Sequence, residues 1–132
     1  MAIGVARASK RPVLGTLGDS TFFHSGMPAM VNAVFNNTRI TMVVLDNSAT
    51  AMTGFQPHPG TGYTAMGEQT TRIAPEDVAR ACKVPFVAVI DPFEVKHSIE
   101  VLEDAIRFEG PALVVSRHPC EIIAASQRRK SG

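Results

Sequence analysis

Two short polar motifs in this sequence carry side chains that are suited to binding a metal ion. The first is Gly18-Asp19-Ser20 and the second is Asp46-Asn47-Ser48, and each directly follows an apolar run. Because the carboxyl ends of neighbouring parallel strands meet at one edge of a sheet, we expect Asp19 and Asn47 to face the same crevice. A carboxylate, an amide oxygen and a nearby backbone carbonyl are hard ligands that suit Mg²⁺, which also takes phosphate oxygens. The two motifs together therefore indicate a diphosphate that is bridged to the protein by Mg²⁺.

The same motifs can also be interpreted as ordinary turns. Gly, Asp, Asn and Ser all favour turns for local conformational reasons, and either motif alone would be weak evidence for a ligand site. In the ligand interpretation, Gly18 permits a tight turn out of the strand. The backbone N–H groups around Ser20 and Thr21 then face a phosphate at the start of the next helix. The position of both motifs after buried strands favours this interpretation and leaves the turn alternative open.

The pattern of apolar residues predicts the elements that would position these motifs. Short apolar runs predict buried strands over residues 13–17, 40–45, 86–90 and 112–115. Helical patterns cover residues 28–35, 75–82 and 94–108, and residues 1–10 look like the end of a helix. Continuous apolar strands separated by helices indicate a mostly parallel sheet covered on both faces, which is a three-layer α/β fold. A chain that opens on a crossover helix is expected to lack the first strand of its domain.

Residues 48–73 break this pattern, because they show neither a helical nor a strand period and are rich in glycine and proline. A long irregular segment inside a compact domain is usually functional or disordered. This segment directly follows a strand end, where open parallel sheets bind their ligands. We therefore expect a functional segment that is mobile without its ligand, with Met52, Phe55 and Met66 available to anchor it.

Composition and charge exclude several classes of protein. The 132 residues suffice for one domain, and the formal net charge of +1 gives no electrostatic case for nucleic acid or a membrane surface. No apolar stretch is long enough to span a bilayer and the N-terminus lacks the apolar core of a signal peptide, so we expect a cytoplasmic protein. Cys82 and Cys120 lie far apart, so we expect free thiols and no iron–sulfur cluster on this chain.

The two motifs and the longer strings around them carry a resemblance to a known family. Gly18-Asp19-Ser20, with Asn47 placed 28 positions after Asp19, resembles the thiamine-diphosphate motif that opens with Gly-Asp-Gly and ends with Asn, although Ser replaces the third residue. Three strings resemble the alpha subunit of indolepyruvate ferredoxin oxidoreductase, in the 2-oxoacid:ferredoxin oxidoreductase family. They are GDSTFFHSGMPAMVNAVFN, VVLDNSATAMTGFQPHPGTG and DPFEVKHSIEVLEDAIRFEGPALVVSRHPCEI. The resemblance covers residues 3–122.

The resemblance implies a site for thiamine diphosphate and Mg²⁺. Asp19 and Asn47 would be the side-chain ligands of Mg²⁺, and the backbone carbonyl of Ala49 would be the third protein ligand. The other cofactor contacts implied by the resemblance are Gly18, Ser20 and Thr21 at the diphosphate, and Thr50, Ala51, Met52 and Thr53 along the cofactor toward its thiazolium ring.

Two histidines near the motifs are candidates for a catalytic role. His24 follows the first motif, and His58 lies between Pro57 and Pro59 in the irregular segment. Histidine titrates near neutral pH, so either ring is able to contact a 2-oxoacid carboxylate or to move a proton. A histidine on the surface or in a structural hydrogen bond is an equally good interpretation of each.

The resemblance also implies parts that this sequence does not contain. Thiamine catalysis needs a carboxylate on a separate pyrimidine-binding domain, and the family's alpha subunit carries a ferredoxin-like region with clustered cysteines. We therefore expect residues 1–132 to be a partial diphosphate-binding domain that works with those parts on other chains or segments, in a homo- or hetero-oligomer. The assembly would oxidatively decarboxylate an aryl 2-oxoacid such as indolepyruvate to an acyl-CoA and reduce ferredoxin.

Two other functions remain open from the sequence. The chain would also suit a subunit of a non-oxidative 2-oxoacid decarboxylase of the sulfopyruvate type, but the HPGTG string and the C-terminal string argue against it. A degenerate module that binds a diphosphate without catalysis is the other alternative, and the presence of both Asp19 and Asn47 argues against that.

Overall fold

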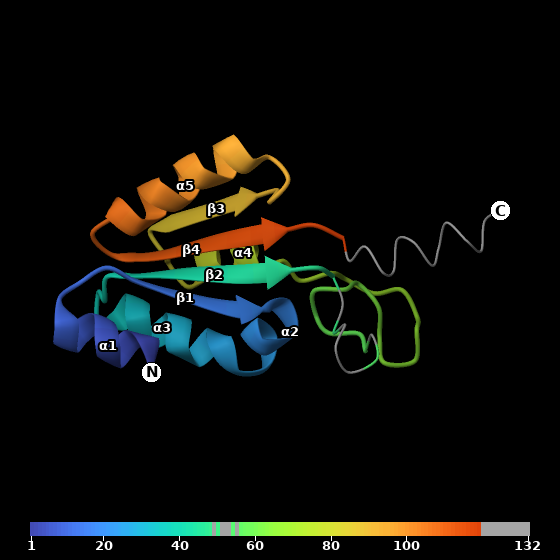
Figure 1. Cartoon of the computed structure of the whole chain (residues 1–132). Helices are drawn as coiled ribbons and strands as arrows, with labels where there is room; N and C mark the ends of the chain where they lie inside the picture. Colours follow the sequence, from blue (N-terminus) through green and yellow to red (C-terminus); the bar gives the residue numbers. More distant parts are fainter. Residues whose placement is uncertain (49, 51–53, 55, 120–132) are drawn as a thin grey trace.

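Four parallel strands form the central sheet of the computed structural model, which describes residues 1–48, 50, 54 and 56–119. They are β1 (Val13–Gly18), β2 (Ile40–Asp46), β3 (Phe86–Ile90) and β4 (Pro111–Arg117), in the spatial order β1-β2-β4-β3 (Figure 1). β1 pairs with β2 so that Gly18 lies opposite Leu45. Because the two strands run in the same direction, Asp19 and Asp46 stand at the same edge of the sheet.

The burial of the strands explains their sequences. β2 and β4 lie in the middle of the sheet and are buried along most of their length, as continuous apolar runs predict for parallel strands. β1 lies at an edge and alternates between half-buried and exposed residues over most of its length. All four predicted strands are confirmed, but β1, β2 and β4 continue to Gly18, Asp46 and Arg117. Those end residues are glycine or charged, so apolar periodicity did not indicate them.

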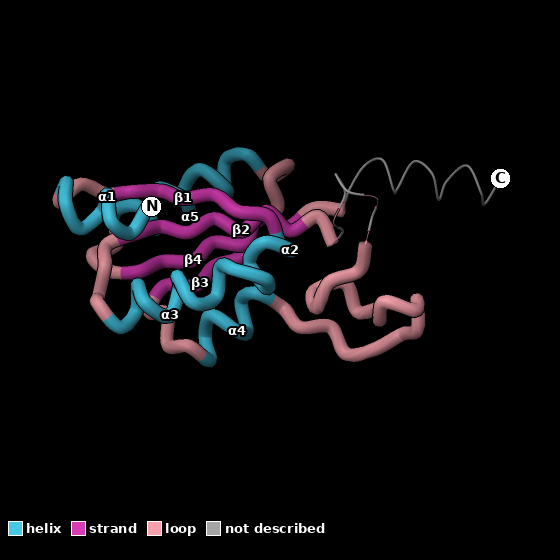
Figure 2. Tube along the Cα trace, turned by 90° about the horizontal axis from the view of Figure 1, so that it is seen from below, coloured by secondary structure: helices cyan, strands magenta, loops and turns pink. Residues whose placement is uncertain are grey.

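Helices cover both faces of the sheet. They are α1 (Ala2–Ser9), α2 (Asp19–Thr21), the π-helix η1 (Phe22–Gly26), α3 (Met27–Phe35), α4 (Pro75–Ala81) and α5 (Val95–Arg107). Figure 2 shows α1, α3 and α4 together on one face, while α5 packs on the other face against β3 and β4. The predicted three-layer α/β fold is therefore confirmed. None of the helices in the described ranges is both long and apolar enough to cross a membrane.

The helix that follows β1 begins earlier than the sequence predicted. We expected it to start at Pro28, but residues 19–35 are helical throughout, because η1 joins α2 to α3. In that wider turn the backbone N–H of Met27 donates to the carbonyl of Phe22, five residues back. Pro28 has no N–H for a regular helical hydrogen bond, and a π-type turn just before it lets the chain stay helical. As a result, Asp19 is the first residue of the whole helical stretch.

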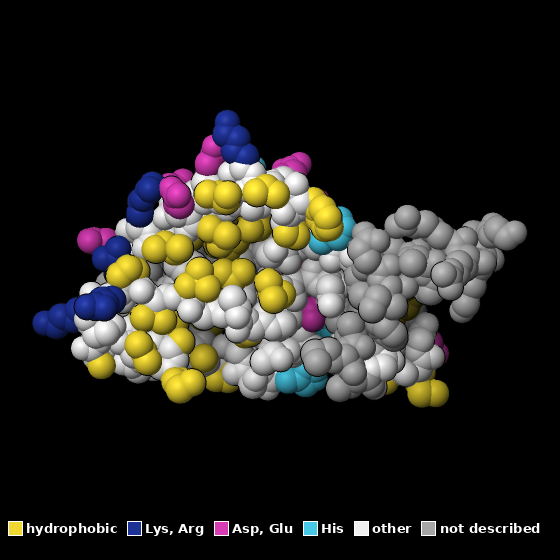
Figure 3. Space-filling view, viewed as in Figure 1, with side chains coloured by type: hydrophobic (Ala, Val, Ile, Leu, Met, Phe, Trp, Pro, Cys, Tyr) yellow, Lys and Arg dark blue, Asp and Glu magenta, His cyan; other side chains and the backbone are white. Residues whose placement is uncertain are grey.

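Two clusters of buried side chains hold the layers together. The larger cluster lies under α1, α3 and α4 and includes Phe22, Met30 and Leu113. The smaller cluster lies under α5 and includes Val43 and Val114. Hydrophobic side chains also reach the surface over α5 and the neighbouring strands, as the yellow area of Figure 3 shows. The exposed large hydrophobic residues of these elements include Leu14, Leu45, Val95 and Ile99. α5 therefore leaves part of the sheet on its side exposed to solvent.

Candidate functional site

Asp19 is buried at the carboxyl edge of the sheet, with 4% of its surface exposed. Its Oδ1 accepts a 2.7 Å hydrogen bond from the backbone N–H of Ser20. Gly18, just before it, has φ −74° and ψ 160°, which is extended backbone that any residue adopts, so the expectation that Gly18 makes a tight turn out of the strand is wrong. A Cβ at Gly18 would meet nothing within 4 Å. The missing side chain therefore leaves open space immediately beside Asp19.

His58 lies against the second oxygen of the Asp19 carboxylate. Its Nε2 is 3.2 Å from Oδ2 of Asp19, and both side chains are buried. That distance is short enough for an ion pair, but the two groups are not aligned as a hydrogen bond. Within the described part of the chain, both atoms are therefore buried polar atoms without a hydrogen-bond partner.

The environment of Asp19 disfavours its negative charge. Burial raises the pKa of Asp19 above its ordinary value of 3.8, and the charge of Asp46 adds to that rise. The backbone N–H groups of Ser20 and Ser48 and the nearby His58 oppose it. The contribution of Ser48 means that the chain after β2 lies next to Asp19. A cation bound here would stabilise the ionised carboxylate.

Asn47 is half-buried at the end of β2, in the second motif. The chain turns sharply directly after it: Ser48 has a left-handed φ of 58°, and its N–H donates a 3.0 Å hydrogen bond to Oδ1 of Asp46. The tight turn predicted for Gly18 therefore occurs at Ser48. Asn47 also lines a cleft of about 250 Å³, together with Leu45 and His118. The structure thus brings the two motifs to one edge of the sheet and leaves space beside each.

A network of charged side chains fixes Asp46, the residue before Asn47. Nε of Arg117 donates to Oδ2 of Asp46 at 2.7 Å, and its other two nitrogens donate to the two carboxylate oxygens of Glu76 at 2.9 and 2.7 Å. Arg72 donates to the same Asp46 oxygen at 3.1 Å. Sequence reasoning missed this network, because Asp46 and Arg117 are 71 residues apart and no local pattern links them.

The network keeps its own members charged. Burial alone would raise the pKa values of Asp46 and Glu76, but the hydrogen bonds from Arg117 outweigh it and lower both. The same hydrogen bonds, above all those to Glu76, raise the pKa of Arg117. Asp46 and Asp19 are thus neighbouring carboxylates with opposite shifts. Asp46 anchors the chain on either side of it, whereas burial disfavours the charge of Asp19.

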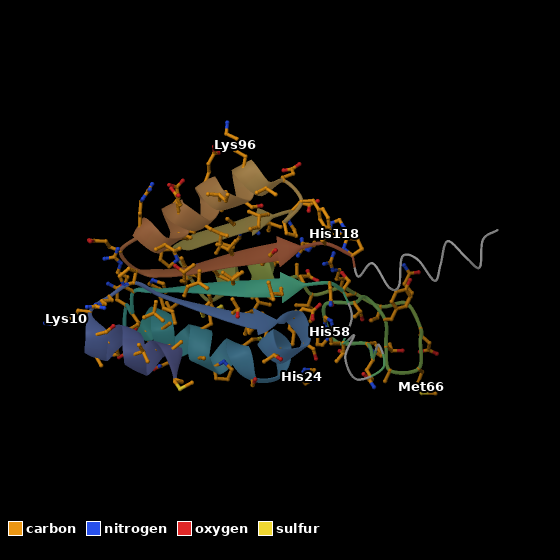
Figure 4. All side chains as sticks on the ribbon, in the orientation of Figure 1. Lys10, His24, His58, Met66, Lys96 and His118 are labelled. Carbon is orange, nitrogen blue, oxygen red and sulfur yellow. The ribbon has the colours of Figure 1, made fainter. Side chains whose placement is uncertain are left out.

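The other predicted site residues that the structure describes are His24, Thr21 and Thr50. His24 is exposed, and its Nδ1 lies 2.7 Å from the carbonyl oxygen of Ser20 in its own helical stretch. Thr21 is exposed, and Thr50 is half-buried in an isolated bridge to Gln56. Figure 4 shows His24 and His58 at the end of the molecule toward which the strand arrows point. Four predicted site residues lie outside the described residues: Ala49, Ala51, Met52 and Thr53.

The segment 48–73 contains no helix or named strand in its described part, as predicted, and is folded by turns. The backbone N–H of Ile73 donates to the carbonyl of Pro59, and Nε of Arg72 donates to the carbonyl of Gly60 at 2.8 Å. Met66 is 86% exposed, so the expectation that it anchors the segment is wrong. The anchors are His58 and Arg72, which are polar and therefore did not stand out in the apolar pattern. Met52 and Phe55, the other expected anchors, lie outside the described residues.

The residues present at this edge fit a divalent cation. A buried polar atom is normally paired, yet Oδ2 of Asp19 lacks a hydrogen bond from any described residue. Carboxylate and amide oxygens are the hard ligands that such a cation prefers. The described residues contain no cluster of three or more His, Cys, Asp or Glu side chains that would hold a metal. A cation held by Asp19 would therefore need amide or backbone oxygens as well.

Comparison with known proteins identifies the fold. The family model for thiamine pyrophosphate enzymes, C-terminal TPP binding domain, matches residues 1–116. The chain belongs to this family. The TPP-binding domain is similar to "Indolepyruvate oxidoreductase subunit IorA" of Archaeoglobus fulgidus, with 43% identity over 98% of this chain and 21% of the relative. The same-named subunit of Pyrococcus horikoshii is 47% identical over 93% of this chain and 19% of the relative. The resemblance seen in the sequence is confirmed, and the chain spans about a fifth of the length of these relatives.

Solved structures agree with the architecture of the TPP-binding domain. A 2-oxoglutarate:ferredoxin oxidoreductase from Magnetococcus marinus superposes with a TM-score of 0.80 at 23% identity, covering 91% of this chain and 44% of that chain. A thiamine diphosphate-dependent 4-hydroxybenzoylformate decarboxylase from Rhodococcus jostii superposes with a TM-score of 0.64 at 24% identity, over 89% of this chain and 22% of that chain. At these identities, the two structures establish the shared fold.

Proposed function

We propose that this TPP-binding domain holds thiamine diphosphate through Mg²⁺ as part of a 2-oxoacid:ferredoxin oxidoreductase. The observation that supports this most strongly is the burial and incomplete hydrogen bonding of the Asp19 carboxylate. It is a buried carboxylate with a raised pKa and an oxygen that lacks a hydrogen bond from the described residues. An ordinary turn has no need of such a group, because burying a carboxylate oxygen without a hydrogen bond costs stability, and Nε2 of His58, 3.2 Å away, is not aligned to donate one. A bound cation is therefore the better explanation of the Gly18-Asp19-Ser20 motif.

In this proposal the chain supplies ligands and position. Asp19, Asn47 and the carbonyl of Ala49 bind the metal. The backbone N–H groups of Ser20 and Thr21 face the diphosphate, and the open space at Gly18 admits it. Residues 50–53 run along the cofactor. When bound, thiamine diphosphate supplies the carbon nucleophile and the electron sink for decarboxylation, and the protein supplies orientation and electrostatics.

The proposed substrate is an aryl 2-oxoacid such as indolepyruvate, and the support for it is the name of the curated relatives. His24 is exposed at the same end of the molecule and is the remaining candidate for contacting the substrate carboxylate. The matched region is 21% of the Archaeoglobus relative. We place the pyrimidine-binding and ferredoxin-like parts of the assembly in the rest of such a polypeptide or on partner chains, with ferredoxin and coenzyme A as co-substrates.

Isothermal titration calorimetry with thiamine diphosphate tests the proposal. The parent chain should bind the cofactor in the presence of Mg²⁺ and lose most of that affinity in EDTA. Asp19→Ala should bind no better with Mg²⁺ than the parent does without it, while its far-ultraviolet circular dichroism stays unchanged. Asp104→Ala, on the exposed face of α5, is the matched control and should bind like the parent. Equal Mg²⁺-dependent binding by Asp19→Ala and the parent would contradict the metal assignment.

A further inference from the structure

The ring of His58 is held rigidly by its surroundings. Its side chain is 0% exposed, and the ring lies 5.9 Å from the ring of Phe23 between centroids, at an interplanar angle of 30°. Gly60 makes this packing possible, because a Cβ there would lie 2.9 Å from the Phe23 ring and 3.0 Å from the His58 ring. A ring enclosed in this way has no face turned to solvent from which to reach a 2-oxoacid.

The hydrogen bond at Nδ1 of the His58 ring determines whether Nε2 carries a proton. The backbone N–H of Gly60 donates to Nδ1 of His58 at 3.2 Å. Nδ1 is therefore the acceptor, which assigns the proton of the neutral ring to Nε2. Nε2 is the atom that lies 3.2 Å from Oδ2 of Asp19. Nε2–H of His58 thus faces one oxygen of the carboxylate at 3.2 Å, although it is not aligned for a hydrogen bond in this structure, while the backbone N–H of Ser20 donates to the other oxygen.

We infer that His58 is a positioning residue that holds the Asp19 carboxylate for the metal and so links the segment 48–73 to the metal site. This inference rests on the proposed function. Carboxylates that bind metals are usually held by an outer hydrogen-bond donor, and loss of that donor typically weakens metal binding by about 10- to 100-fold. Each carboxylate oxygen has two lone pairs, so Oδ2 is able to accept from His58 and still bind a cation.

The segment 48–73 should respond to metal binding. His58 lies ten residues into the segment, and Arg72 ties its far end to Asp46. A cation bound at Asp19 would therefore fix the carboxylate against which the His58 ring lies. Metal binding should slow hydrogen exchange at Gly60 and Thr61, whose N–H groups bond to the His58 ring and carbonyl.

Two variants of His58 and one control distinguish the effect of its N–H donor on metal binding from the effect of its ring volume. His58→Gln keeps an N–H donor near the position of Nε2, whereas His58→Met fills similar space without a donor. His97→Ala, on the exposed surface of α5, is the control. Mn²⁺ is titrated by electron paramagnetic resonance in the whole chain with saturating thiamine diphosphate. We expect about 10- to 100-fold weaker Mn²⁺ binding for His58→Met, a change of less than about threefold for His58→Gln, and no change for His97→Ala.

Two outcomes overturn the inference, and they differ from failure of the proposed function. Parent-like Mn²⁺ affinity in His58→Met would show that the donor does not hold Asp19. Equal losses in His58→Met and His58→Gln would show that the ring acts by shape alone. If the parent chain itself binds no Mn²⁺ with the cofactor, the proposed function fails and this inference fails with it. Circular dichroism and slow hydrogen exchange at β2 and β4 confirm that each variant is folded.

Discussion

Asp19 and Asp46 are neighbouring carboxylates that differ in their partners. Asp46 is hydrogen-bonded to Arg117 and Arg72, and its pKa is lowered. Asp19 faces the His58 ring, and burial raises its pKa. Groups whose environments push their pKa values apart usually have different roles. Asp46 anchors the chain, and Asp19 is the metal ligand of the proposed function. The motif in the sequence indicated Asp19, but only the folded chain explains why Asp46 is not equivalent to it.

Replacing Asp19 by Asn should stabilise the ligand-free protein by about 0.5–2 kcal/mol. The amide keeps the oxygen that accepts the Ser20 hydrogen bond, and removal of a negative charge that burial disfavours outweighs the loss of the contact between that carboxylate and Nε2–H of His58. Urea unfolding at neutral pH without divalent ions measures the change. The control Asp104→Asn, on the exposed surface of α5, should stay within about 0.5 kcal/mol of the parent. A destabilisation by Asp19→Asn of more than about 1 kcal/mol would mean that Asp19 is a structural residue.

The residues around the site were partly predictable. Asp19 and Asn47 were found because polar residues directly after buried strands are visible in the sequence. The burial of His58 was not, since a histidine between two prolines reads as a surface turn. Its partners Phe23 and Asp19 are more than 30 residues away in the chain. Sequence reasoning therefore identified the candidate ligands Asp19 and Asn47, but not the buried histidine ring beside Asp19.

At the scale of the elements, the charged network joins four parts of the fold. Asp46 ends β2, Arg117 ends β4, Glu76 lies in the first turn of α4, and Arg72 lies near the end of the segment 48–73. The segment is thereby fixed to the sheet at both of its ends. Apolar periodicity predicted β2, β4 and α4, although not that β2 and β4 reach Asp46 and Arg117. It contains no information on how these charged side chains pair.

Arg117→Met should destabilise the chain by about 3–5 kcal/mol, because it leaves Asp46 and Glu76 as buried charges without their main partner. Chemical unfolding followed by circular dichroism measures this loss. Arg107→Met is the matched control: it breaks an exposed ion pair with Glu103 on α5 and should cost no more than about 0.5 kcal/mol. Similar losses in the two variants would show that the network is not a structural anchor.

Glu76 gives the network a defined dependence on pH. Although burial acts in the opposite direction, the hydrogen bonds from Arg117 lower the pKa of Glu76 below its ordinary value of 4.5. Ionised Glu76 therefore contributes stability above that value, and the contribution is lost as the pH falls through the lower pKa of the folded state. Glu76→Gln should be less stable than the parent at neutral pH, and the difference should shrink below about pH 4.5. Unfolding free energies across this range test it, and a difference that stays constant would contradict the assignment.

At the scale of the whole molecule, the chain is a TPP-binding domain. It spans about a fifth of the length of its curated relatives. The sequence predicted the family through the motif and the longer strings around it, and the family model confirms it. The identity of the partners was not predictable in the same way, since an interface depends on surfaces that both sides supply.

The chain alone should show no oxidoreductase turnover. The cofactor is activated by a carboxylate expected on a pyrimidine-binding domain, and the electrons need a nearby cluster. An assay of the purified chain with indolepyruvate, coenzyme A, thiamine diphosphate, Mg²⁺ and an artificial electron acceptor tests this. Addition of the missing parts should restore activity. Steady turnover by the chain free of other subunits would require an activating carboxylate of its own, such as Glu68 or Asp77.

A crystal structure of the chain with thiamine diphosphate and Mn²⁺ would test the central claim most directly. Anomalous scattering locates Mn²⁺ without reference to the expected ligands. We predict one peak at the carboxyl edge of β1 and β2, about 2.1 Å from an Asp19 carboxylate oxygen, the Asn47 amide oxygen and the Ala49 carbonyl, with diphosphate oxygens completing the site. Cofactor bound with no metal at Asp19, or a metal peak away from both Asp19 and Asn47, would contradict the account.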